Sequence, residues 1–318
     1  MQKLLITRRL PDLVLDTARK HFDVTLRDSA TPLDGGELRA ALRDYDLILP
    51  TLGDQFRADV FADVPAPRAR ILANFGVGYN HIDVTAAHAA GLVVTNTPGA
   101  VTDATADIAM TLILMTARRA GEGERILRAG DWQGWTPTQM LGHPVTGATV
   151  AIIGMGRIGQ AIARRCHFGF GMSVIYHNRS KRDLDFPATQ VSMEQAMAAD
   201  FVVIAVPGGA DTHHLINAET FSHMRPYGIF INIARGDVVD EAALLAALTT
   251  GQIAGAGLDV YEREPQITAG LTALENVTLL PHLGTAVLRV REAMGMMALD
   301  NLIAHTAGRA PPNVILLK

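Results

Sequence analysis

The sequence predicts an α/β protein built from two doubly wound parallel-sheet domains. Three features carry this prediction: short apolar runs alternate with helix-like stretches, a long apolar helix interrupts the series, and a glycine-rich turn follows one apolar run. Apolar runs between helical stretches are typical of parallel strands covered on both faces. A length of 318 residues corresponds to about two domains.

The first series of elements ends at the turn of residues 97–99. Its expected strands lie at residues 4–7, 22–26, 46–50, 70–74 and 92–96, with a helix around residues 37–42. A long apolar helix is then expected over residues 103–118. The polar stretch of residues 121–142 carries several glycines and both tryptophans, so it lacks the pattern of a core element.

The second series begins near Ala148. Its expected strands lie at residues 149–153, 173–176, 201–206, 229–233, 253–258 and 277–280. A last helix, expected over residues 288–307, has apolar residues at helical spacing. Because this helix follows the second sheet, we expect it to return to the first domain. The expected domains are therefore residues 1–98 plus 286–318, and residues 99–285.

Composition excludes several classes of protein. Hydrophobic residues make up 48% and charged residues 19%, so the chain can bury large cores and is not intrinsically disordered. A formal charge of −4 gives no basic surface for nucleic acid and no reason to expect membrane binding. The single cysteine, Cys166, rules out an intrachain disulfide and favours a reducing compartment. Arginines interrupt the N-terminal apolar residues before a secretory signal forms, so we expect a cytoplasmic protein.

A dinucleotide-binding motif follows the first expected strand of the second series. Gly154, Gly156 and Gly159 form a GxGxxG pattern that opens a helix, and this context gives the pattern its weight. Gly154 would permit the tight turn, Gly156 would let the backbone approach a pyrophosphate, and Gly159 would pack helix against strand. The amides of Arg157 and Ile158 would point at the phosphate from the helix N-terminus. A plain glycine-rich turn in a βαβ unit is the alternative.

The end of the next expected strand bears on the choice of cofactor. NAD sites usually carry an acid there, but this chain has Asn178 followed by three cations. A carboxylate would repel a 2′-phosphate, whereas Arg179 could bind it with two hydrogen bonds and Ser180 could donate another. We therefore predict that NADP(H) is preferred and that NAD(H) is the alternative cofactor. An ordinary solvated loop is the competing interpretation.

Three polar residues follow successive strands of the second series. Arg235, a carboxylate of the segment 257–265 and His282 can converge in one cleft, because the carboxyl ends of parallel strands meet at one edge of a sheet. Arg235 leaves a buried strand, where a charge without a partner is costly. Each residue also has a structural alternative: His282 could be an ordinary core histidine, and Arg235 could pair with Asp237. Beside a dinucleotide fold, the three together indicate catalysis.

These motifs make the chain resemble the D-isomer-specific 2-hydroxyacid dehydrogenases along its whole length. The resemblance rests on residues 74–83, 154–159, 232–236, 257–260, 264–265 and 281–285. Within the family the chain looks most like the bacterial glyoxylate/hydroxypyruvate reductases, a group that includes 2-ketogluconate reductases. The resemblance implies a substrate-binding domain (residues 1–98 plus 286–318), a Rossmann dinucleotide-binding domain (residues 99–285), a cleft between them and a homodimer.

The resemblance also assigns catalytic roles. His282 would be the general acid that protonates the carbonyl oxygen of a small 2-oxo acid as hydride reaches its carbon. Glu264 would bind the other ring nitrogen, orient the ring and favour its protonated form near neutral pH. Arg235 would grip the carboxylate and carbonyl of the substrate. The product would be a D-2-hydroxy acid.

Binding residues follow from the same resemblance. The amides of Val77 and Gly78 would form a small anion site for the substrate carboxylate, and the loop at Leu52 would face the substrate side chain. Cofactor contacts are implied for Thr105, Val206, Pro207, Thr212, the Ala234 carbonyl and Asp259. No metal cluster is expected, since the adjacent pair His213–His214 lacks a third ligand and is more typical of the start of a helix.

Several alternatives stay open at this point. A 2-ketogluconate reductase is one, because the sequence does not rank these substrates. A phosphoglycerate dehydrogenase would need a phosphate site in the first domain, yet residues 74–83 contain no Lys or Arg. A non-enzymatic NAD(P)-sensing protein of the co-repressor type would keep the fold and the three polar residues without turnover. Trp132 and Trp135 would either reach the partner's active site or anchor the dimer.

Overall fold

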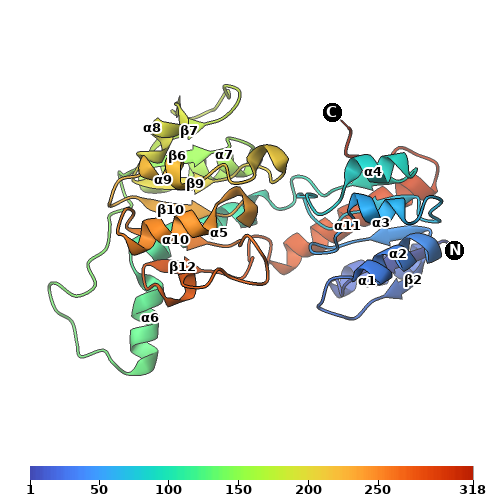
Figure 1. Cartoon of the computed structure of the whole chain (residues 1–318), viewed down its shortest axis with the longest axis horizontal. Helices are drawn as coiled ribbons and strands as arrows, with labels where there is room; N and C mark the ends of the chain where they lie inside the picture. The colour runs from blue at the N-terminus through green and yellow to red at the C-terminus, as the bar shows by residue number, and fades with distance from the viewer. Residues whose placement is uncertain (318) are drawn as a thin grey trace. The chain divides into compact units, whose positions relative to one another are not determined.

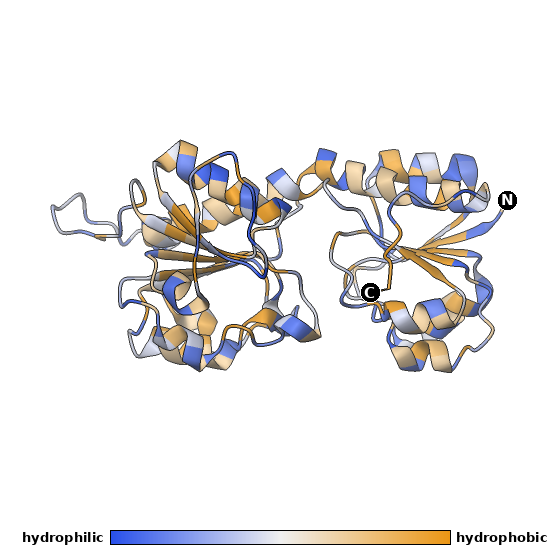
Figure 2. Ribbon diagram, turned by 90° about the horizontal axis from the view of Figure 1, so that it is seen from above, coloured by the Kyte–Doolittle hydropathy of each residue, from blue (hydrophilic) through white to orange (hydrophobic). Residues whose placement is uncertain are grey.

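The computed structural model describes residues 1–317, and the chain divides into two compact units (Figure 1). Unit 1 comprises Met1–Val101 and the C-terminal segment from Ala286, and unit 2 comprises Thr102–Thr285. Each unit holds a parallel sheet with apolar strands at its centre and helices on both faces (Figure 2). The predicted α/β class with two parallel sheets is confirmed.

Unit 1 is built on a five-stranded sheet of order β2-β1-β3-β4-β5, with all strands parallel. The strands are β1 (Lys3–Ile6), β2 (Asp23–Leu26), β3 (Leu47–Leu49), β4 (Ile71–Ala73) and β5 (Val93–Thr95). The helices are α1 (Asp12–His21), α2 (Gly35–Asp44), α3 (Ala58–Ala62), α4 (Val84–Ala89) and α11 (Leu288–Thr306). The strand order reverses between β1 and β3, which is where sheets of this topology place ligands.

Strand periodicity explains why both faces of this sheet are covered. Successive side chains of a strand point to opposite faces, so Leu5 packs toward α2 and α3, whereas Leu4 and Ile6 pack toward α1 and α11. Helix α2 begins at a capping box in which Asp34 and Glu37 exchange side chain and backbone hydrogen bonds. These local signals fix where the helices begin and which of their faces are buried.

The C-terminal tail closes one edge of unit 1. After α11, Val314 pairs with Thr95 in an antiparallel bridge, and the Ile315 amide donates to the Val94 carbonyl at 2.9 Å. The tail therefore covers strand β5, whose free edge would otherwise expose unpaired backbone groups.

Unit 2 is built on a seven-stranded parallel sheet of order β12-β11-β10-β9-β6-β7-β8. The strands are β6 (Thr149–Ile153), β7 (Ser173–His177), β8 (Thr189–Gln190), β9 (Phe201–Ile204), β10 (Ile229–Asn232), β11 (Gly255–Leu258) and β12 (Val277–Leu279). Helices α5 (Thr102–Ala117) and α7 (Arg157–Arg164) cover one face, and α8 (Met193–Met197), α9 (Ala218–Ser222) and α10 (Glu241–Thr249) cover the other. The order reverses between β6 and β9, so the loop after β6 lies at the switch point.

Two elements of unit 2 were not among those predicted from the sequence. Strand β8 has two residues, which is too short for an alternating pattern to reveal. Helix α6 (Ala120–Ala129) lies within the polar stretch and buries none of its side chains, which agrees with the expectation that this stretch is not core. In the described part of the chain, no helix has the length and apolar character needed to span a membrane.

Candidate active site

The glycine turn has the geometry of a dinucleotide-binding loop. Gly154 has φ +100°, and a Cβ there would come within 2.8 Å of the backbone at Ala205. A Cβ on Gly159 would lie 2.1 Å from the Gly154 carbonyl oxygen, so α7 packs directly on the turn. Gly156 is exposed, and a Cβ there would meet no atom within 4 Å. The space above Gly156 and the amides at the start of α7 fit a pyrophosphate.

Asn178 organises the segment that follows β7. Its side-chain oxygen accepts from the Met155 amide at 3.2 Å, and its side-chain nitrogen donates to the Ser180 carbonyl at 2.8 Å. Asn178 therefore ties the glycine turn to the loop that carries Arg179, whose side chain is exposed. The Arg182 amide donates to the Tyr176 hydroxyl at 3.1 Å, which holds the far end of this loop.

His282 and Glu264 form the central pair of the site. The His282 Nδ1 atom lies 2.8 Å from Glu264 Oε2, and the Tyr261 amide donates to Glu264 Oε1 at 3.0 Å. Burial raises the pKa of Glu264, but the hydrogen bond and charge of His282, with help from Tyr261 and Arg235, outweigh burial and hold this pKa below its usual value. The structure therefore brings together two residues that are 18 positions apart in sequence.

His282 is held in an unusual backbone conformation. Its φ of +54° is in the left-handed region, which non-glycine residues rarely adopt. Both carboxylate oxygens of Asp259 accept backbone amides just after it, from Leu283 at 2.6 Å and from Gly284 at 2.8 Å. The hydroxyl of Thr105 donates to the Gly284 carbonyl at 3.1 Å. These three hydrogen bonds fix the segment that presents the imidazole.

Arg235 lies at the end of β10, next to this pair. Its Nη1 atom donates to the Ala234 carbonyl at 2.6 Å. Burial lowers the pKa of Arg235, and the charges of Glu264 and Asp237 offset part of that effect. A guanidinium after β10 and an imidazole after β12 can bind a carboxylate and donate a proton to a nearby oxygen.

The resemblance also implies cofactor contacts at Val206, Pro207 and Thr212, and these residues lie after β9, at the same edge of the sheet. Val206 and Pro207 follow β9, beyond the strand end at Ile204. The Thr212 hydroxyl donates to the carbonyls of Pro207 at 2.8 Å and Gly209 at 3.1 Å, which closes the turn. The prediction that His213 and His214 begin a helix is wrong. They follow a short 3₁₀ turn (Ala210–Thr212), and α9 begins only at Ala218 because Asn217 supplies its cap.

In unit 1, the predicted anion site lies in the loop after β4. Asn74 donates to the Gly76 and Gly78 carbonyls at 3.0 Å each, and Asn96 donates to the Val77 carbonyl at 2.9 Å. With these carbonyls engaged, the Val77 and Gly78 amides make no hydrogen bond within residues 1–317. Two unengaged amides in succession can bind an anion.

Leu52 lies in the loop after β3 and is 36% exposed. Arg8 donates to the Thr51 hydroxyl at 2.8 Å and to the Leu52 carbonyl, which holds this loop in place. Asn74 and Asn96, which shape the anion site, were not predicted as site residues. The only signal in the sequence was an asparagine at each strand end.

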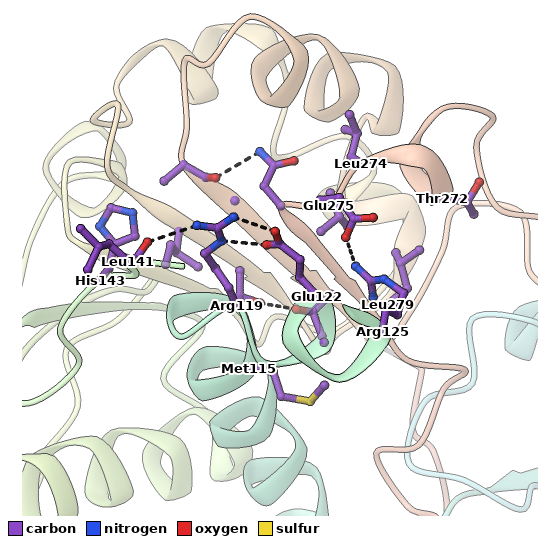
Figure 3. Close-up of a pocket in the computed structure, with 18 residues that line it drawn as sticks. Met115, Arg119, Glu122, Arg125, Leu141, His143, Thr272, Leu274, Glu275 and Leu279 are labelled. Atoms are coloured by element: carbon purple, nitrogen blue, oxygen red, sulfur yellow. Dashed lines mark hydrogen bonds and ion pairs between the residues drawn. The ribbon is translucent and has the colours of Figure 1, made fainter. Parts of the chain in front are cut away.

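A separate cavity of about 550 Å³ lies in unit 2, between α6 and the β12 edge. Figure 3 shows Arg119 paired with Glu122, and Arg125 directed at Glu275. None of the predicted catalytic residues lines this cavity. Among the described residues there is also no cluster of three side chains that could hold a metal ion.

The chain is similar to known proteins along nearly its whole length. A model of the family described as "D-isomer specific 2-hydroxyacid dehydrogenase, NAD binding domain" matches residues 110–284. A glyoxylate reductase of Thermococcus gammatolerans is 43% identical over 321 residues, which cover 98% of this chain and 95% of that protein. A crystal structure of the NADPH-dependent glyoxylate/hydroxypyruvate reductase of Sinorhizobium meliloti, in complex with NADP and malonate, matches with a TM-score of 0.88 and 37% identity, covering 99% of this chain and 96% of that one.

Proposed function

This chain belongs to the D-isomer specific 2-hydroxyacid dehydrogenase family, and from that premise we propose that it reduces glyoxylate and hydroxypyruvate to D-2-hydroxy acids with NADPH. It is an NAD(P)-dependent 2-hydroxyacid dehydrogenase. The observation that supports the reaction best is the hydrogen bond of 2.8 Å between His282 Nδ1 and Glu264 Oε2. It leaves Nε2, which makes no hydrogen bond within the described residues, to act on a substrate.

The acid step is assigned to His282. A carboxylate on Nδ1 fixes the tautomer and stabilises the imidazolium, so that Nε2 carries a proton. The Nε2 proton passes to the carbonyl oxygen of the 2-oxo acid while Glu264 balances the ring charge. NAD(P)H, when bound at the glycine turn, would supply the hydride for the carbonyl carbon.

Arg235 is proposed to bind the substrate. Its planar guanidinium presents several donors in a fixed arrangement, which suits the adjacent carboxylate and carbonyl of a 2-oxo acid. The Val77 and Gly78 amides are proposed as a second set of carboxylate donors, and Leu52 as a contact to the substrate side chain. Partial burial strengthens the hydrogen bonds of Arg235 relative to those in water.

The dinucleotide is proposed to bind at the glycine turn and along the wall after β9. The proposed contacts are Gly154, Gly156, Arg157, Ile158, Gly159, Val206, Pro207, Thr212, Ala234, Asp259 and Thr105. NADP(H) is proposed as the preferred form because no acid comes directly after β7: Asn178 stands there, bound to the Met155 amide of the glycine turn, and Arg179 and Ser180 come next. The carboxylate of Asp259 is already engaged by two amides, so its proposed cofactor contact is additional to its role in holding the His282 segment.

Substitution of His282 tests the reaction. His282→Ala should lower kcat with NADPH and glyoxylate by about two to four orders of magnitude, because the general acid is lost. NADPH affinity should change little, and His21→Ala, an exposed histidine at the end of α1, serves as the control. If kcat stays within a few-fold of the parent value, His282 is not the acid. If the parent protein binds NADPH tightly but turns over no 2-oxo acid, the result would favour the alternative of a non-enzymatic NAD(P)-sensing protein.

Substitution after β7 tests the cofactor preference. We expect about a ten- to hundredfold preference for NADPH at low salt, since Arg179 is exposed and partly screened. Asn178→Asp with Arg179→Ala should reverse it, because a carboxylate repels the 2′-phosphate yet keeps an oxygen for the Met155 amide. Equal kcat/KM for NADH and NADPH in the parent enzyme would contradict the proposal.

A separate measurement addresses the choice of substrate. Comparing kcat/KM for glyoxylate, hydroxypyruvate and 2-ketogluconate at a fixed concentration of NADPH would rank the three substrates.

A further inference from the structure

We propose that His214 and Glu262 are positioning residues that brace the Glu264 and Arg235 segments against each other. This inference rests on the proposed function, because the role inferred for His214 and Glu262 is to hold Glu264 against the general acid His282. His214 and Glu262 lie 48 positions apart in sequence, and neither was predicted as a site residue. Their contacts lie entirely within unit 2.

His214 joins two segments of the active site through different atoms. Its backbone amide donates to the Asp237 carbonyl at 2.9 Å, and Asp237 follows Arg235 by two residues. Its ring atom Nε2 lies 3.1 Å from Glu262 Oε1, and Glu262 precedes Glu264 by two residues. An ionised carboxylate can only accept, so Nε2 is the donor. One residue therefore holds both chain segments that carry catalytic side chains.

Glu262 is held in turn by the start of α10. The Glu262 amide donates to Glu241 Oε1 at 2.8 Å, and the Glu241 amide lies 3.4 Å from Glu262 Oε2. Glu241 is 3% exposed and also accepts from the Thr268 hydroxyl. Both oxygens of Glu262 are therefore used, one by His214 and one by α10, which fixes the direction of the chain leading to Glu264.

Close packing transmits the restraint between the two segments. A Cβ on Gly236 would lie 1.8 Å from the carbonyl carbon of Tyr261, so the backbone after Arg235 rests directly on the backbone before Glu264. The Tyr261 amide itself donates to Glu264 Oε1 at 3.0 Å. A shift of the Tyr261–Glu262 segment therefore moves the carboxylate that binds His282.

The backbone conformation of His214 is consistent with a functional role for this residue. Its φ of +47° is in the left-handed region, where asparagine or glycine would be less strained. Among residues 1–317, three other non-glycine residues have positive φ, and one of them is His282. Residues in this conformation cluster at functional sites, where the surrounding contacts hold them in place. The ring of His214 also stacks on His213 with centroids 4.0 Å apart, which limits its rotation.

The test compares His214→Leu with His214→Gln. Leucine removes the donor to Glu262, whereas the glutamine amide can place a donor near the position of Nε2. With NADPH and glyoxylate, His214→Leu should lower kcat by about tenfold, since a small displacement of a catalytic group is costly. The alkaline midpoint of the kcat/KM profile should move toward lower pH by about half a unit, because Glu264 no longer stabilises the protonated ring as well. The charged groups around that ring are Glu264, Asp259 and Arg235.

His214→Gln should recover most of kcat and the parent midpoint. His88→Leu, at an exposed histidine of α4, is the control and should keep both parent values. The Kd for NADPH, measured by fluorescence, should stay within about threefold of the parent value in every variant. If His214→Leu does not fold, Glu262→Gln replaces it, since an amide cannot accept from both His214 and the Glu241 amide and should shift the midpoint in the same direction.

Three results would contradict the positioning role proposed for His214 and Glu262. One is an unchanged midpoint in the variant that breaks the His214–Glu262 bond. Another is a Gln variant no better than the Leu variant at equal melting temperature. The third is a loss confined to NADPH binding, which would assign His214 to the cofactor wall. If His282→Ala loses activity while His214→Leu keeps it, only this inference fails. If His282→Ala keeps activity, the proposed function fails first.

Discussion

At the scale of single residues, the site depends on charges that are only partly solvated. The side chains of His282 and Glu264 are 28% and 31% exposed, so each keeps some access to water while their contact is short. Arg235 leaves a strand whose residues are all buried, and its guanidinium is desolvated. Such groups are stable because neighbouring charges and hydrogen bonds compensate for lost hydration.

Arg235→Lys should not behave as a conservative change. Lysine keeps the positive charge but loses the planar, multi-donor group that can hold a carboxylate and a carbonyl together. We expect KM for glyoxylate to rise by about tenfold or more and kcat to fall, with NADPH affinity near the parent value. Steady-state kinetics and a separate NADPH titration would measure this. Parental kinetics would remove Arg235 from the substrate site.

Glu264→Gln should change how stability depends on pH. The pKa of Glu264 is lowered in the folded protein, so its carboxylate stabilises the fold above the usual value of 4.5, and this contribution is lost as pH falls through the folded pKa. The gap in melting temperature between the parent and Glu264→Gln should therefore be largest near pH 6 and should shrink toward pH 3. Asp259 is present in both proteins, and its raised pKa is caused mainly by burial, with the charge of Glu264 a smaller cause. A gap that is independent of pH would contradict the assignment.

At the scale of elements, the active site depends on backbone segments that touch directly. The 3₁₀ turn Gly236–Val238 lies against the chain at Tyr261, at a distance that leaves no room for a side chain. Sequence patterns show a glycine after Arg235 but do not show which segment lies against it. The contact explains why glycine is the residue that fits there.

Gly236→Ala should therefore damage both stability and catalysis. The added methyl would overlap the Tyr261 carbonyl group and push the turn away, at a cost of about 1–3 kcal/mol. For a unit of this size, that corresponds to a melting temperature lower by about 2–12 °C. Gly169→Ala is the control, because a Cβ there meets no atom within 4 Å and its φ is not positive. Differential scanning fluorimetry and kcat would decide, and equal melting temperatures for the two variants would refute the packing argument.

At the scale of the whole molecule, the stretch from α6 to Leu141 carries large apolar side chains that do not pack in the core of unit 2. Helix α6 buries no side chain, and Leu127, Trp132, Trp135 and Leu141 are 60%, 51%, 78% and 68% exposed. Large exposed apolar side chains grouped in one stretch are typical of an interface. We therefore propose a homodimer in which this stretch contacts the partner.

Sedimentation velocity can test this assembly. The parent protein should sediment with about twice the chain mass of 34.1 kDa. Trp135→Ser together with Leu127→Ser should shift the population toward monomer, because the apolar contact is removed. Leu13→Ser, which changes a 53% exposed leucine on α1, should leave the mass unchanged. A parent protein that is monomeric at micromolar concentration would refute the proposal.

Much of this architecture could be predicted because its signals are local. The run Thr149–Ile153 followed by three spaced glycines indicates strand, turn and helix within a few residues, and the structure has that order. Each other predicted strand also forms, with ends that differ by a few residues, because both faces of each sheet are covered and most of the strands are apolar runs. The expectation that Arg235, a carboxylate and His282 meet followed from the rule that parallel strands end at one edge, and the family resemblance identified the carboxylate as Glu264. Of that set, the hydrogen bond between Glu264 and His282 is present in the structure.

By itself, then, the sequence determined the fold class, the glycine turn and the catalytic candidates, because each depends on near neighbours or on strand direction. Only the tertiary structure decided what those groups touch. It showed the Asp259 carboxylate on the Leu283 and Gly284 amides and His214 on Glu262, in contacts that span 24 to 48 residues of sequence. No periodicity encodes such pairs, since polar partners are selected by the distance between atoms in the folded chain. The order of residues indicates which groups reach the edge of the sheet, and three-dimensional packing determines which of them are held in place.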